Sequence, residues 1–369
     1  MSVVTIYCCG TGEDRDKTAN IVPATWGTTC GDRSWINDGP GNGNAKYAIL
    51  KSEHVLETIE RGSKLKKGAF GSKNTSSAKG NLGGVGTQDN IINTIQWLWF
   101  EYYRLGAPPI TAINLCGWSR GAVTCIMLAH AIEEAGFREK IPALKVNIFA
   151  IDPVPGGAND FGSGNFDKTG RTGSPDELSA CVGEYQAVLA ENVGGAKGSA
   201  FRNCSPTFKG QGPVGRKMEF PLPGTHSDVA KLSGAVGKLS VSLCHRFLTS
   251  HGTELAISLE MTEAEELEQF AIILLEHGKF SKGIFRREPV FKKWDVAFER
   301  RARVENKERA HRFFVNSYHA VLFQRALPVF ANYINTPPPK AISGSQIADL
   351  RSRYPNTWQA MVNVGYLNA

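Results

Sequence analysis

The chain has 369 residues, of which 41% are hydrophobic and 21% are charged, which is ordinary for a soluble globular protein with a large core. The formal net charge of +7 is mildly basic and fits scattered solvated lysines, so we predict no nucleic-acid partner and leave contact with a membrane surface open. No apolar run is long enough to span a bilayer, and the N-terminus lacks the pattern of a signal peptide. We therefore expect a cytoplasmic location in the producing cell, with any export following a route that needs no cleavable signal.

The N-terminal residues 2–9 are β-branched and aromatic, which predicts a core strand that ends at Gly10-Thr11-Gly12. A glycine-rich loop at a strand end is well placed to lend backbone N–H groups to an oxyanion. Residues 27–45 and 61–90 are rich in Gly, Asn, Ser or Lys and are predicted to be loops. The second of these is either a solvated loop or a basic flap that faces substrate.

A βαβ order follows in the next segment of the chain. Residues 88–105 have helical apolar spacing, residues 110–118 predict a strand, a helix continues to about Gly136, and residues 144–151 predict the next strand. Such a crossover implies parallel strands. We therefore predict an α/β protein of α/β-hydrolase-like type, with a mostly parallel central sheet flanked by helices, insertion loops and a helical C-terminal part.

The remaining chain is less regular. Residues 155–213 predict an insertion or lid, or else a disordered excursion, in which only residues 176–190 look helical. Residues 216–220 predict another strand, and Thr262-Glu263-Ala264-Glu265 is a capping box that opens a helix. We predict a core over residues 1–235 and a helical part over residues 236–369 that packs on the core or extends it.

The strongest chemical signal is Gly117-Trp118-Ser119-Arg120-Gly121, placed between a predicted strand and a predicted helix. A G-x-S-x-G nucleophile elbow strains the serine backbone, so residues two before and two after it must have almost no side chain. The helix N-terminus then directs its N–H groups toward a developing oxyanion. The alternative is a tight βα turn in which Ser119 only caps the helix.

A serine nucleophile needs a base and a group that orients the base. Asp152 ends the strand one βα unit after the elbow, and His226 follows later, which matches the order serine, acid, histidine. His319 is the reserve base. The eight cysteines form no C-x-x-C pair and no Cys/His cluster with zinc spacing, so we expect reduced thiols and no metal.

Three stretches carry a family resemblance: residues 117–122 (GWSRGA), 149–154 (FAIDPV) and 223–229 (PGTHSDV). In this order they resemble motifs of the bacterial and fungal α/β-hydrolases of formerly unknown function that include type VI secretion lipase (phospholipase) effectors. Residues 8–12 look like a diverged form of that family's N-terminal D-G-T strand end. The resemblance covers about residues 1–235 and implies that Ser119, Asp152 and His226 form the catalytic triad.

The resulting expectation is a serine hydrolase of carboxylic esters, with the oxyanion held by backbone N–H groups of Arg120 and of Gly10, Thr11 and Gly12. This chemistry requires no cofactor. The resemblance implies a phospholipid substrate and, for an antibacterial or host-directed effector, a secretion-apparatus partner and an immunity protein. The alternatives are a small-ester, thioester or peptide hydrolase, and a non-catalytic interaction protein on the same scaffold.

Overall fold

The computed structural model describes residues 2–31, 33–40, 87–154, 177–190, 206–208, 216–222 and 226–262, with short stretches between 265 and 288. Within these ranges the secondary-structure elements follow one another as β1 (Ser2–Cys8), α1 (Ile21–Thr28), β2 (Ser34–Asn37), α4 (Thr87–Tyr103), β3 (Ile110–Trp118), α5 (Arg120–Glu134), α6 (Phe137–Lys140), β4 (Lys145–Ile151), β5 (Glu177–Leu178), β6 (Val182–Ala190), β7 (Thr207–Phe208), β8 (Arg216–Leu222), α7 (Ala235–Ser250), β9 (Ser281–Gly283) and β10 (Arg286–Glu288).

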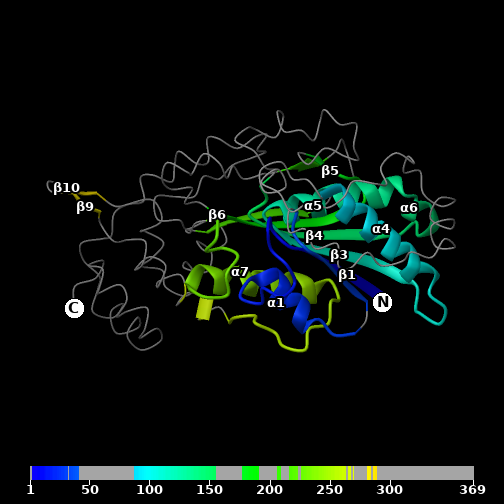
Figure 1. Cartoon of the computed structure of the whole chain (residues 1–369), viewed down its shortest axis with the longest axis horizontal. Coiled ribbons are helices and arrows are strands. Elements are labelled where there is room, and N and C mark those ends of the chain that lie inside the picture. Colours follow the sequence, from blue (N-terminus) through cyan, green and yellow to red (C-terminus); the bar gives the residue numbers. More distant parts are fainter. Residues whose placement is uncertain are drawn as a thin grey trace.

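The central sheet has six strands in the order β2-β1-β3-β4-β6-β8, and every pair in it is parallel. Helices α4, α5 and α6 cover one face, while α1 and α7 lie on the other (Figure 1). Strands covered on both faces need mostly apolar sequence, and β4 accordingly buries Val146, Ile148, Phe149, Ala150 and Ile151. The predicted α/β class with a mostly parallel sheet and flanking helices is therefore confirmed.

The βαβ segment agrees with the sequence pattern. Helix α4, strand β3, helix α5 and strand β4 lie where their apolar spacing predicts them, and β8 starts at the predicted Arg216. Helix α5 is buried along most of its length because it packs on both β3 and β4. The capping box is also present: the Glu265 carboxylate accepts the Thr262 backbone N–H at 2.8 Å, and the Thr262 hydroxyl accepts the Glu265 N–H at 3.4 Å.

The helix predicted for residues 176–190 is wrong. This segment forms β5 and then β6, which lies between β4 and β8 in the central sheet. Tyr185 and Leu189 stand four residues apart and are both buried, which imitates a helical face, but most of β6 is buried, including the consecutive residues 187–190. The predicted insertion over 155–213 therefore includes a core strand.

Several further elements have no counterpart among the predicted ones, namely strand β2, helix α1, the four-residue helix α6 and the short strands β7, β9 and β10. Strand β2 lies inside the predicted loop 27–45, where its four residues are flanked by Gly and Asp. Helix α1 contains Pro23 and Gly27, both poor signals for a helix, yet it packs on β1 and on α7. In both cases tertiary contacts outweigh a weak local signal.

Helix α7 begins at Ala235, next to the predicted start of the helical part at residue 236. It packs against β4, and the rings of Phe149 and Phe247 lie 5.5 Å apart. Seven of the eight cysteines are described, and all seven are free. No helix in the described ranges is both long enough and apolar enough to cross a membrane.

The sheet register brings the functional segments to one edge. Cys8 of β1 lies beside Gly117 of β3, Trp118 lies beside Ile151 of β4, and Ala190 of β6 lies beside Leu222 of β8. Because all six strands run in the same direction, the chain segments that follow them leave at this carboxyl edge. This edge is where parallel α/β sheets bind their ligands.

Candidate active site

Ser119 occupies a strained turn between β3 and α5. Its backbone has φ 57° and ψ −122°, a conformation that residues other than glycine rarely adopt. A Cβ atom on Gly117 would lie 2.5 Å from the Gly121 carbonyl oxygen, and one on Gly121 would lie 2.0 Å from the Cys8 carbonyl oxygen. Both glycines are therefore required by the close approach of β1, β3 and α5.

The structure does not agree with the alternative in which Ser119 serves only as a helix cap. Ser119 is the N-cap residue of α5, but its side chain makes no capping hydrogen bond. Its hydroxyl instead lies 2.9 Å from Nε2 of His226. The backbone is held by the Ser119 N–H, which donates to the Ile151 carbonyl at 2.9 Å.

Asp152 follows β4 and is also held in an unusual conformation, with φ 42°. Its backbone N–H donates to the Val188 carbonyl at 2.7 Å, and its Oδ1 accepts the Ala190 N–H at 2.8 Å. The other carboxylate oxygen, Oδ2, lies 2.6 Å from Nδ1 of His226. The side chain is almost fully buried, and strand β6 therefore orients it.

His226 follows β8 and connects the other two side chains. An ionised carboxylate can only accept hydrogen bonds, so the contact with Asp152 assigns the proton to Nδ1. Nε2 is then the acceptor for the Ser119 hydroxyl. The structure thus brings together the three predicted side chains in a serine–histidine–aspartate arrangement, while His319 lies outside the described residues.

Two of the four predicted oxyanion donors, the backbone N–H groups of Gly10 and Gly12, form other hydrogen bonds in the structure. The Gly10 N–H donates to the Glu13 carboxylate at 3.1 Å, and the Gly12 N–H donates to the Pro40 carbonyl at 3.1 Å. Because these two N–H groups already have acceptors, the predicted oxyanion donors that remain are the backbone N–H groups of Thr11 and Arg120. Arg120 is the first residue of α5, and its Nη1 donates to the Thr11 hydroxyl at 3.2 Å, which connects the two remaining candidates.

The charged side chains of Glu13 and Arg120 are also buried at this edge. Burial raises the pKa of Glu13 from 4.5 to about 7, against the opposing effects of the Gly10 N–H and of Lys17. Burial also lowers the pKa of the Arg120 guanidinium. The Glu13 carboxyl therefore changes charge near neutral pH beside the Gly10–Gly12 loop, a feature that the sequence pattern does not reveal.

Trp118 is a further residue to which the sequence pattern assigns no role. Its notable sequence signal is its place in the elbow, directly before Ser119. In the structure its ring stacks on His226, with ring centroids 5.1 Å apart and an interplanar angle of 27°.

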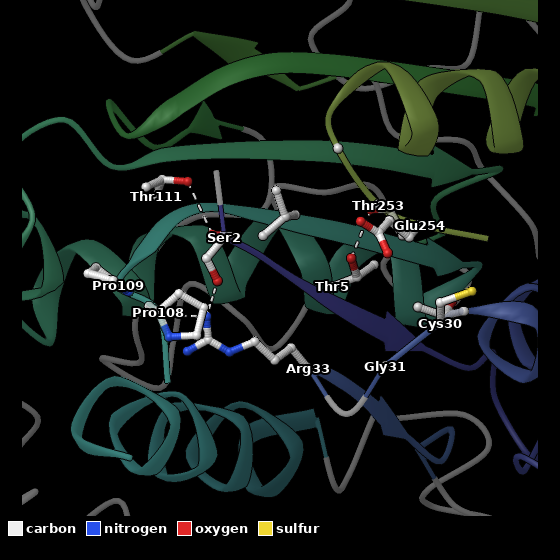
Figure 2. A pocket seen from close by; sticks show the side chains of 13 residues that line it. Ser2, Thr5, Cys30, Gly31, Arg33, Pro108, Pro109, Thr111, Thr253 and Glu254 are labelled. Carbon is white, nitrogen blue, oxygen red and sulfur yellow. Dashed lines mark hydrogen bonds between the residues drawn. The ribbon is translucent and has the colours of Figure 1, made fainter. Parts of the chain in front are cut away.

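A cavity of about 480 Å³ lies at the opposite, amino edge of the sheet. Its lining includes Ser2, Arg33, Pro108 and Thr253 (Figure 2). The Arg33 guanidinium at its margin already donates to the Ser2 hydroxyl and to the Pro108 carbonyl. This cavity is separate from the three side chains described above, because it opens where the strands begin and not where they end.

Within the described part of the chain, no group of three or more His, Cys, Asp and Glu side chains is arranged to hold a metal ion.

No protein-family model matches the chain, and no curated protein matches it. Among solved structures, a crystal structure of an uncharacterized protein from Pseudomonas aeruginosa is similar, with 10% sequence identity and a TM-score of 0.39. The similarity covers 97% of this chain and 63% of that chain.

Proposed function

We propose that the protein is a serine hydrolase that cleaves carboxylic ester bonds. The observation that carries this proposal is the unbroken contact from Ser119 Oγ to His226 Nε2, at 2.9 Å, and from His226 Nδ1 to Asp152 Oδ2, at 2.6 Å. Both distances lie within hydrogen-bond reach, the geometric requirement for a nucleophile and its general base. The strained backbone of Ser119 supports the same conclusion.

The proposed reaction proceeds by acyl transfer to water. His226 Nε2 takes the Ser119 proton as Oγ attacks the ester carbonyl carbon, and Asp152 stabilises the imidazolium through the Nδ1–H. The carbonyl oxygen becomes an oxyanion, for which the backbone N–H groups of Arg120 and Thr11 are the candidate donors. The imidazolium then gives its proton to the leaving alcohol, and water repeats the cycle on the acyl-enzyme.

The substrate class that we propose is the phospholipid ester, with the protein acting as a secreted antibacterial or host-directed effector. Support comes from the resemblance of residues 117–122, 149–154 and 223–229 to the lipase family, with weaker support from the net charge of +7, which favours anionic membrane surfaces. Such an effector would have a secretion-apparatus partner and an immunity protein. A serine and histidine separated beyond hydrogen-bond reach would instead have favoured the interaction-protein alternative.

The experiment measures fatty-acid release from vesicles of mixed anionic and zwitterionic phospholipids by the purified protein. Ser119→Ala is the test variant, and Ser250→Ala, which changes an exposed serine at the end of α7, is the matched control. Release by the wild type and by Ser250→Ala, with loss in Ser119→Ala, is the expected result.

Two other results would redirect the proposal. Labelling of Ser119 by a fluorophosphonate without lipid cleavage would retain the serine hydrolase and move the substrate to small esters, thioesters or peptides. Absence of both labelling and cleavage would contradict the proposed enzyme and favour an interaction protein.

A further inference from the structure

Trp118 makes two contacts with His226, one to its side chain and one to its backbone. The indole ring stacks on the imidazole at 5.1 Å with an interplanar angle of 27°. The indole Nε1–H donates to the His226 carbonyl oxygen at 3.3 Å. A single side chain on β3 therefore contacts both the imidazole ring and the backbone carbonyl of the histidine that follows β8.

The other neighbour of the indole is the loop after β1. A Cβ atom on Gly10 would lie 2.3 Å from Cε3 and 2.6 Å from Cζ3 of Trp118, so the six-membered ring lies directly against this glycine. Gly10 is adjacent to Thr11, a candidate oxyanion donor. Trp118 thus contacts both the loop of the proposed oxyanion hole and the proposed base.

The stacking supplies a constraint that Asp152 cannot supply. The hydrogen bond from Nδ1 to Asp152 fixes one atom of the imidazole but lets the ring swing about that atom. A nearly parallel aromatic surface restricts this motion and keeps Nε2 directed at Ser119 Oγ. The ring face also attracts the positive charge that the imidazole acquires when it takes the serine proton.

We propose that Trp118 is a positioning residue for His226, and that it acts both by stacking on the imidazole and by binding the His226 carbonyl. This inference rests on the proposed function for its effect on rate. Its effect on the histidine itself does not depend on any substrate. The indole takes no part in bond making or breaking in this scheme, so its removal should change the turnover step and not substrate binding.

The test compares Trp118→Leu, which removes both contacts, with Trp118→Phe, which retains an aromatic face but lacks the N–H. The control is Trp35→Leu: Trp35 stacks on Trp97 at 5.5 Å and 24°, and its Nε1–H donates to Asn37 at 2.9 Å, so it matches Trp118 in both contacts without meeting His226. The measurements are the rate of fluorophosphonate labelling, kcat and KM for p-nitrophenyl butyrate, and the low-field proton resonance of the His226 Nδ1–H. His226→Gln assigns that resonance.

We expect Trp118→Leu to lower kcat and the labelling rate about 10-fold to 100-fold, with KM unchanged, because stacking and a hydrogen bond are both lost. Trp118→Phe should lose only about fivefold, since the stack is retained. The Nδ1–H resonance should broaden or vanish in Trp118→Leu and persist in Trp118→Phe. Trp35→Leu should keep the wild-type rate per folded molecule and the resonance.

Wild-type rates and an intact resonance in Trp118→Leu would overturn the inference, as would equal losses in the leucine and phenylalanine variants. If Trp118→Leu does not fold, Trp118→Phe decides, and a wild-type kcat in that variant contradicts the role of the N–H. Failure of the proposed function has a different signature, because the wild type would then show neither labelling nor hydrolysis. In that case, an Nδ1–H resonance that is present in the wild type and lost in Trp118→Leu still supports the positioning role of Trp118. Absence of this resonance from the wild type overturns the positioning role.

Discussion

The two edges of the parallel sheet are built from the same strands but differ in backbone strain. At the carboxyl edge, Ser119 and Asp152 follow the adjacent strands β3 and β4, and they are the two non-glycine residues with positive φ among those described. At the amino edge, no non-glycine residue that lines the cavity beside Arg33 has a positive φ, and the Arg33 guanidinium donates a hydrogen bond to the Pro108 carbonyl.

This difference indicates where the fold accepts a cost in stability. Residues in sparsely populated backbone regions cost about 1 to 3 kcal/mol each and persist only where the surrounding structure holds them. Here the Ile151 and Val188 carbonyls hold the Ser119 and Asp152 N–H groups. The amino edge shows hydrogen bonding without strain, so we expect substitutions there to change stability alone, and substitutions at the carboxyl edge to change activity.

The largest expected effect is on catalysis at the carboxyl edge. Asp152→Asn should lower kcat by about 10⁴-fold, because an amide favours the wrong imidazole tautomer at His226. The fold should be retained, since the amide oxygen can still accept the Ala190 N–H that Oδ1 now accepts. Steady-state ester hydrolysis, together with circular dichroism, measures both quantities. A variant with wild-type turnover would contradict the role assigned to Asp152.

A second prediction tests the close packing that creates the elbow. Gly121→Ala should lower the free energy of unfolding by at least about 2 kcal/mol and abolish fluorophosphonate labelling, because the new Cβ would lie 2.0 Å from the Cys8 carbonyl oxygen. Gly27→Ala in α1 is the matched control: Gly27 is exposed, and a Cβ added there would have nothing within 4 Å. That variant should gain about 0.5 kcal/mol from higher helix propensity, and denaturant unfolding checks both values.

A third prediction concerns a buried histidine that lies away from the site. His245 accepts the Leu259 N–H at Nδ1, which leaves Nε2–H to donate to the Thr25 hydroxyl. Burial lowers its pKa from 6.5 to about 4 in the folded protein. The unfolded chain therefore binds a proton that the folded chain does not, so stability falls as the pH decreases from 6.5 toward 4.

The size of this contribution is about 3 kcal/mol at most. Urea unfolding of the wild type at several pH values, compared with His245→Gln, measures it, and the variant should show a weaker dependence on pH between 6.5 and 4. The same slope in both proteins would exclude His245 as the cause. Fluorophosphonate labelling at neutral pH should be unchanged in folded His245→Gln.

The smallest effect is expected at the amino edge. The Thr253 hydroxyl lies 2.8 Å from the Thr5 hydroxyl and accepts a hydrogen bond from Nδ2 of Asn114 at 2.8 Å. Thr253→Val keeps the shape of the side chain but removes these bonds, and should lower stability by about 1 to 2 kcal/mol. Its turnover should equal that of the wild type. A large loss of activity in this variant would contradict the separation between the two edges.

Several features of the fold can be predicted from short-range patterns. The βαβ segment is recognisable because α4 and α5 have apolar residues at helical spacing and because β3 and β4 are mostly apolar runs with clear boundaries. Strand β6 resembles a helix in sequence because Tyr185 and Leu189 have helical spacing, and only burial on both faces of the sheet distinguishes the two structures. Helix α1 and strand β2 are short, and their local signals are too weak to be recognised.

For the candidate site, the sequence by itself determined the elbow around Ser119, since Gly117 and Gly121 are required by steric contact close to the serine. It also determined the order of Ser119, Asp152 and His226, which the family motifs suggested. Only the tertiary structure decided which side chains meet, that Gly10 and Gly12 have other acceptors, and that Trp118 stacks on His226. The physical reason is that these contacts join the ends of strands β1, β3, β4 and β8, and the parallel register across the sheet sets their distances.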